Sequence, residues 1–62
     1  MNKVDLKKWM LLKKKSETSI SLYRVLEVAE EILVIDCVKK TMPVWKKVEV
    51  FDDYEVVEEN LN

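Results

Sequence analysis

The strongest indication of fold class lies in residues 21–38, which read SLYRVLEVAEEILVIDCV. β-Branched side chains are dense in this stretch, and they favour extended backbone because a helix restricts their χ1 rotamers. We predict two strands, 21–28 and 32–38, folded back as an antiparallel hairpin over residues 29–31. A single helix is the alternative, because apolar side chains also recur at helical spacing at Leu22, Val25, Leu26, Ala29, Ile32 and Leu33.

The charged residues of this hairpin predict its register. If Val28 faces Ile32 across the three-residue loop, Arg24 stands opposite Asp36. A slip by one residue would leave each charge beside an apolar partner. We therefore predict a cross-strand ion pair between Arg24 and Asp36.

The stretch before the hairpin, residues 4–15, predicts a short N-terminal helix. Leu6, Trp9 and Met10 recur at helical spacing. Three lysines fall in the last turn, where the helix dipole favours positive charge. A polar loop at residues 16–19 then leads into the hairpin.

The stretch after the hairpin predicts further strands. Pro43 ends the second strand, because proline has no backbone N–H to donate. Residues 44–45 and 54–57 read as short strands. Between them, residues 46–53 fit either a strand or a tight helical turn.

Together these elements predict a mainly β (α+β) fold in one small domain, 1–62. It would comprise a helix within 1–15, an antiparallel sheet of three to five strands within 20–57, and a polar tail at 58–62. Closing such a sheet removes exposed edges, so we expect an SH3-like, partly open barrel. A chain of this length buries only about 60% of its unfolded surface, so a partner or a dimer could add stability.

Composition argues against enzyme chemistry. The chain has no His, no Gly and one Cys, so it lacks the commonest general base, a phosphate-binding glycine loop and a thiolate zinc site. We expect no catalytic residue, no cofactor, no metal and no small-molecule substrate. The acidic residues Asp52, Asp53 and Glu55 match no calcium loop and are expected to be solvated turn residues.

The same composition bears on location. No apolar run approaches the ~18–20 residues of a membrane span, so we expect no membrane association and a cytoplasmic protein. The single Cys37 cannot form an internal disulfide. We expect it to be a small buried apolar residue.

The two tryptophans have two interpretations. Exposed indoles can stack on nucleotide bases, whereas buried ones supply much of the core of a small domain. We expect core packing for both. Trp45 in particular is predicted to lie against the helix that carries Leu6, Trp9 and Met10.

Charge is unevenly distributed, with a basic first quarter and an acidic last quarter. Solvated faces and mutual attraction of the two ends are the simplest explanation. A basic segment can also attract phosphates. The candidate DNA-contacting residues are Lys7, Lys8, Lys13, Lys14, Lys15, Lys39 and Lys40.

Three short segments carry a family resemblance: YRVLEV at 23–28, LVIDC at 33–37, and MPVW at 42–45. In this order, with Lys39 and Lys40 between the last two, they resemble the N-terminal β-rich region of bacterial Mu-type transposases, whose catalytic core is of the retroviral-integrase type. The resemblance covers about residues 20–57. It implies a role in DNA integration without catalysis, because no residue here matches the carboxylate triad of that core.

Two functions therefore remain open. The first is a non-catalytic accessory module of a transposase or integrase, which assists DNA binding or assembly of the complex. The second is a protein-interaction or self-association module unrelated to DNA, with other protein chains or a second copy as partner. Its expected contact surface is Leu22, Leu26 and Val34.

Overall fold

Five strands and a 3-10 helix follow one another in the computed structural model, which describes residues 5–18 and 21–58. In chain order they are β1 (Leu11–Lys14), β2 (Tyr23–Val28), β3 (Ile32–Asp36), β4 (Val44–Lys46), the 3-10 helix η2 (Val48–Asp53) and β5 (Tyr54–Glu58). The hairpin predicted over residues 29–31 is confirmed as β2 and β3, and so are the strands predicted at 44–45 and 54–57. The ambiguous stretch 46–53 contains η2.

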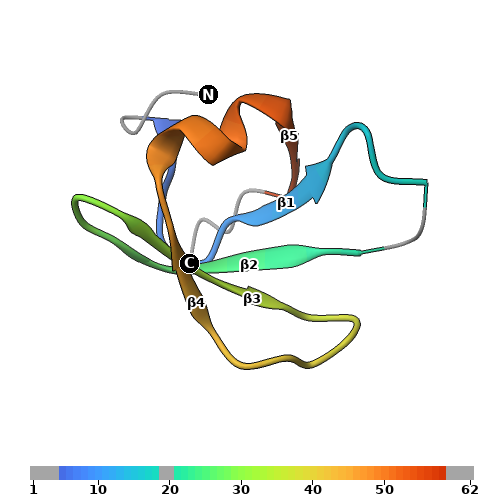
Figure 1. Cartoon of the computed structure of the whole chain (residues 1–62), viewed down its shortest axis with the longest axis horizontal. Helices are drawn as coiled ribbons and strands as arrows, with labels where there is room; N and C mark the ends of the chain where they lie inside the picture. The colour runs from blue at the N-terminus through green and yellow to red at the C-terminus, as the bar shows by residue number, and fades with distance from the viewer. Residues whose placement is uncertain (1–4, 19–20, 59–62) are drawn as a thin grey trace.

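All five strands form one antiparallel sheet in the order β4-β3-β2-β1-β5 (Figure 1). The prediction of a mainly β fold with an antiparallel sheet is therefore confirmed. β1 is a central strand, although it comes first in the described sequence. Within the described residues, β4 pairs only with β3 and β5 pairs only with β1, so these two strands form the edges of the sheet.

The predicted N-terminal helix is wrong. Residues 11–14 form β1, and the described residues before them form turns and irregular backbone. Leu12 is fully buried, and Leu11, whose side chain lies on the opposite face, is 8% exposed. Strand pairing on both sides of β1 outweighs helical spacing, because a short helix without packing partners is marginal in water.

A β-bulge in β2 shifts the predicted register. Next to the turn, Val28 pairs with Ile32 as expected, and Glu27 pairs with Leu33. Leu26 is then the extra residue, and beyond it the pairs are Val25 with Val34, Arg24 with Ile35, and Tyr23 with Asp36. Arg24 and Asp36 are therefore not opposite each other, and the predicted ion pair is wrong.

Each of these two charged side chains has another partner. The Arg24 Nη1 atom donates to the carbonyl oxygen of Trp9 at 2.7 Å. Asp36 is 7% exposed, and its Oδ1 atom accepts from the backbone N–H groups of Val38 and Lys39, both at 2.9 Å. Lys40 has a φ of 56° in the same turn and donates its N–H to the Asp36 carbonyl, so a carboxylate and a left-handed lysine build this turn without glycine.

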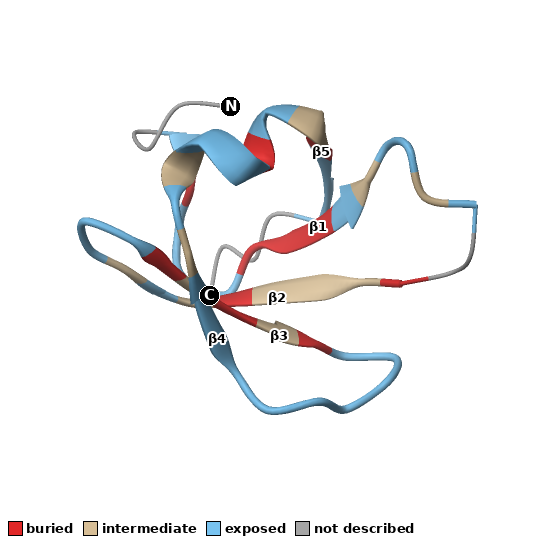
Figure 2. Ribbon diagram, viewed as in Figure 1, coloured by how far each residue is buried: buried red, intermediate tan, exposed pale blue. Residues whose placement is uncertain are grey.

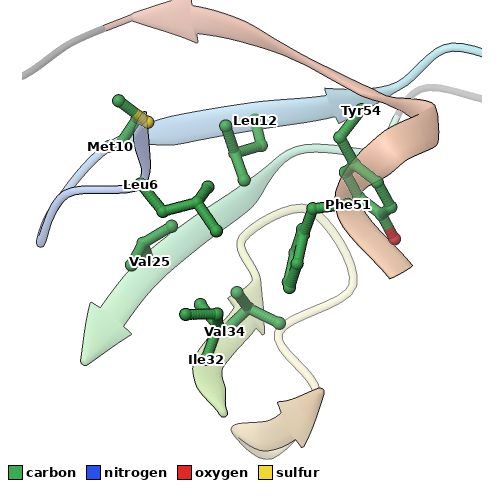
Figure 3. Close-up of a cluster of buried hydrophobic side chains, with 8 residues drawn as sticks. All are labelled: Leu6, Met10, Leu12, Val25, Ile32, Val34, Phe51 and Tyr54. Atoms are coloured by element: carbon green, nitrogen blue, oxygen red, sulfur yellow. The ribbon is translucent and has the colours of Figure 1, made fainter. Parts of the chain in front are cut away.

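The core lies between the inner face of the sheet and η2 (Figures 2 and 3). Phe51 is fully buried and points from η2 toward Val34. The Phe51 and Tyr54 ring centroids lie 5.0 Å apart, and Tyr54 meets Tyr23 edge to face at 5.5 Å. The buried cluster is Leu6, Met10, Leu12, Val25, Ile32, Val34, Phe51 and Tyr54.

Neither tryptophan belongs to this cluster. Trp45 is 51% exposed and Trp9 is 46% exposed, so the predicted burial of Trp45 against a helix is wrong. Phe51 takes the place in the core that was expected for Trp45. The reason is the register, which pairs Trp45 with Leu33, a residue on the face opposite the core.

Candidate functional site

The face of the sheet that points away from η2 is largely apolar. Ile32 and Val34 of β3 are buried in the core, so the alternating Leu33 and Ile35 point to the other side. Cross-strand partners share a face, so Trp45 lies on the same side as its partner Leu33. We call this side of β2, β3 and β4 the outer face and define it by Leu22, Arg24, Leu26, Glu27, Leu33, Ile35 and Trp45.

The bulge in β2 adds a residue to this face. Val25 is fully buried, and Val28 packs against the core three positions later. The two residues between them, Leu26 and Glu27, therefore both belong to the outer side of β2. In a regular strand only one of the two would do so.

Trp9, which lies just before β1, is a second half-exposed tryptophan. The backbone N–H of Trp9 donates to the Val25 carbonyl at 2.7 Å, and the φ of Trp9, 73°, is in the left-handed region. Lys8 Nζ lies 5.3 Å from the centre of the Trp9 ring and 3.8 Å from the Glu27 carboxylate. A row of side chains thus runs across the sheet from Trp9 through Glu27 and Leu33 to Trp45.

Two of the three residues expected to form a contact surface lie on the outer face. Leu22 and Leu26 are partly buried and belong to the outer face. Val34, however, is 1% exposed and lies in the core. Leu33 takes its place, because the bulge changes which β3 side chains share a face with Leu26.

The seven candidate DNA-contacting lysines do not share one face. Lys13 stands opposite Glu55, and the Lys15 N–H donates to the Asp53 carbonyl at 2.7 Å. Lys8 lies near Glu27, as described above. Lys39 and Lys40 are exposed in the β3–β4 turn, and Lys7, Lys13 and Lys15 are exposed elsewhere, whereas Lys14 is partly buried beside Tyr54.

Of the acidic residues expected to be solvated turn residues, Asp52 is exposed in η2, Asp53 is partly buried at the end of η2, and Glu55 is exposed in β5. Asp53 at the end of η2 accepts a hydrogen bond from the Ser16 hydroxyl through Oδ2. This bond ties the β1–β2 loop to η2.

No group of three metal-ligating side chains occurs within residues 5–18 and 21–58, and no pocket is found there. Cys37 is exposed, contrary to the expectation of burial.

Two tyrosines have perturbed acidity. Burial raises the pKa of Tyr23 above its ordinary 10.0, and the Glu17 and Asp36 carboxylates add to this, while the Ser21 hydroxyl opposes it. The Tyr23 hydroxyl donates to Glu17 Oε2 at 3.3 Å. The pKa of Tyr54 is also raised, first by burial and then by the charges of Tyr23, Glu17 and Asp53. Both rings are structural, because Tyr54 belongs to the buried cluster and Tyr23 packs against it.

No family model, curated protein or solved structure matches this chain. The outer face is therefore characterised by its own chemistry. It combines the half-exposed indole of Trp45 with partly exposed aliphatic side chains around one arginine. Among the helices of the described residues, none is long and apolar enough to cross a membrane.

Sequence reasoning missed most of the outer face. Leu33, Ile35 and Trp45 alternate with buried residues, and such alternation is visible in a sequence. Which of the two sets is buried depends on where η2 packs. The one usable signal was the polar position of Arg24 in an apolar row, since an arginine rarely occupies the inner face of a small core.

Proposed function

We propose that this chain is a non-catalytic accessory module that binds another protein through its outer face. The observation that carries the proposal is the half-exposed Trp45 beside Leu33 on that face. Tryptophan and arginine are enriched among the residues that dominate binding energy at protein interfaces. The outer face offers both, with Arg24 between the aliphatic side chains.

We also propose that the sheet is an SH3-like, partly open barrel. Two features support this assignment. The strand order is β4-β3-β2-β1-β5, and a 3-10 helix connects β4 to β5. Such barrels leave their outer surfaces and loops available for partners, while the interior is filled by side chains. Here the interior is filled by the buried cluster around Phe51.

The setting we favour is a transposase or integrase complex, in which the module would assist assembly. Support comes from the resemblance of the YRVLEV, LVIDC and MPVW segments to Mu-type transposases. Trp45 belongs to the last of these segments and is half exposed, as a contact residue should be. The partner would then be a protein of the recombination complex.

Trp45→Ala tests this proposal. Tagged wild-type chain and the variant would be used to capture partners from cells of the source organism, and the captured protein would then be titrated against each. We expect the variant to fold normally and to lose at least about tenfold in affinity, because truncating a central interface tryptophan commonly costs ≥ 2 kcal/mol. A captured protein with an integrase-type core supports the favoured setting.

Met42→Ala is the matched control. Met42 is 83% exposed in the β3–β4 turn and is not part of the outer face. Its truncation should leave partner affinity unchanged. Equal affinity of Trp45→Ala and wild type for every captured protein would overturn the proposal.

DNA contact is a second candidate, favoured by one observation. β1 and β3 run parallel, since both are antiparallel to β2, so their C-terminal ends lie at the same end of the sheet. This brings the lysines at 13–15 and those at 39–40 to one end. A DNA titration at two salt concentrations tests it, because phosphate contacts weaken steeply as salt rises. Lys39→Gln with Lys40→Gln should reduce the salt dependence if these residues touch phosphates.

A further inference from the structure

The two edges of the sheet are its most exposed strands. In β4, Val44 and Trp45 are 48% and 51% exposed, and in β5, Val56 and Val57 are 44% and 50% exposed. No pairing joins β4 to β5 within the described residues. An edge strand presents unpaired N–H and C=O groups, which can pair with another chain. Each edge therefore offers both backbone hydrogen bonds and an apolar strip.

The two edges carry opposite charge. Residues 37–48, which include β4, contain four lysines and no acidic residue. Residues 49–58, which include β5, contain five acidic residues and no lysine or arginine. Lys13 opposite Glu55 offsets one of these charges, whereas Glu58 stands opposite Leu11. The complement of each edge is thus present in the same sequence.

We propose that copies of this chain associate head to tail, with the β4 edge of one copy against the β5 edge of the next. Charge decides between the available pairings. Two β4 edges would bring lysines together, and two β5 edges would bring carboxylates together, whereas β4 against β5 pairs opposite charges. The contact is heterologous, so repetition gives a ring or an open chain of copies. The inference does not depend on the outer face or on any partner bound there.

Charge reversal on each edge tests the pairing. The first variant combines Lys46→Glu at the end of β4 with Lys47→Glu directly after it, and the second combines Glu55→Gln with Glu58→Lys on β5. For wild type at low salt, sedimentation should show an average mass that rises with chain concentration and falls when salt is added. Each variant alone should be monomeric, because residues 44–47 and 54–58, which form the two edges themselves, then carry charge of the same sign. An equimolar mixture should regain the wild-type mass, because the two unaltered edges pair as in wild type and the two altered edges again carry opposite charge.

Several outcomes would overturn this assignment. Wild type that stays monomeric at all concentrations excludes it, and so does a variant that still associates alone. A mixture that stays monomeric would show that another surface joins the copies. Circular dichroism and thermal melting establish that each variant is folded.

A peptide probe decides the matter if a variant does not fold. A synthetic peptide copying residues 53–58, DYEVVE, should compete with wild-type association and lower the average mass. If the peptide leaves the average mass unchanged, the inference is overturned. The peptide could also bind to a wild-type chain that shows no self-association. In that case the β4 edge takes an acidic strand from a different protein, and a second copy of the chain is excluded as the partner.

Discussion

Asp36 shows how one side chain can replace a glycine turn. Its buried carboxylate accepts two backbone N–H groups at the start of the β3–β4 turn. Hydrogen bonds to a charged acceptor contribute about 1.5–3 kcal/mol each, and their loss leaves two donors without a partner. The turn therefore depends on this residue more than on any of the exposed lysines beside it.

We expect Asp36→Ala to lower the free energy of unfolding by about 3 kcal/mol or more, because both donors of the turn lose their acceptor. Asp36→Asn keeps an acceptor oxygen at the same place and should lose less. Chemical denaturation measures both. A wild-type midpoint for Asp36→Ala would show that water replaces the carboxylate at no cost.

Tyr23 and Tyr54 predict a loss of stability at alkaline pH. Burial raises the pKa of each phenol above 10.0 in the folded chain, so folding favours the neutral form. Their contribution is complete below pH 10.0 and is lost as the pH rises through the folded pKa. Thermal melting across this range should show a falling midpoint. The midpoint of the double variant Tyr23→Phe with Tyr54→Phe should fall less steeply, and an identical fall would show that the two phenols are not the cause.

Ser21 is a buried polar residue. It is 1% exposed, and its Oγ atom has no partner with hydrogen-bond geometry within residues 5–18 and 21–58, although the hydroxyl lies close enough to the Tyr23 phenol to lower the pKa of that group. An unsatisfied buried polar group costs about 1–3 kcal/mol, so Ser21→Ala should leave stability unchanged or raise it. Ser16→Ala is the contrasting variant, because it removes the bond to Asp53. A marked loss of stability in Ser21→Ala would reveal a partner for the hydroxyl.

At the scale of elements, η2 determines which side of the sheet becomes the core. Its one buried residue, Phe51, covers the inner face, while Val50 beside it is 42% exposed. Phe51→Ala should cost about 3–5 kcal/mol, comparable to the whole stability of so small a domain. We expect the cooperative melting transition to disappear in this variant, whereas Val50→Ala should melt like wild type. A folded Phe51→Ala would mean that the sheet is held by its strand pairing alone.

At the scale of the whole molecule, the placement of Trp45 separates binding from stability. An indole in the core would make Trp45→Ala unfold the chain. With half of the side chain exposed, we expect a change in the free energy of unfolding of about 1 kcal/mol or less. Thermal melting of Trp45→Ala beside Phe51→Ala checks this directly, because the two aromatic truncations should differ greatly.

Much of the sheet could be predicted because its signals are local. β-Branched density and Pro43 predicted four of the five strands and the three-residue hairpin loop, and each of these depends on neighbours in the sequence. β1 was missed because residues 11–14 are strand only through pairing with β2 and β5. The candidate site was predicted in part, through Leu22 and Leu26.

The outer face, the bulge and the partners of Arg24 and Asp36 depend on contacts between residues far apart in the chain. Phe51 of η2 and Leu33 of β3 are distant in sequence, yet the packing of the first decides that the second faces outward. A bulge of one residue at Leu26 then changes the partner of every β2 residue that precedes it. Local propensity indicates where strands form, but the side that is buried follows from which element covers the sheet, and that is a property of the folded chain.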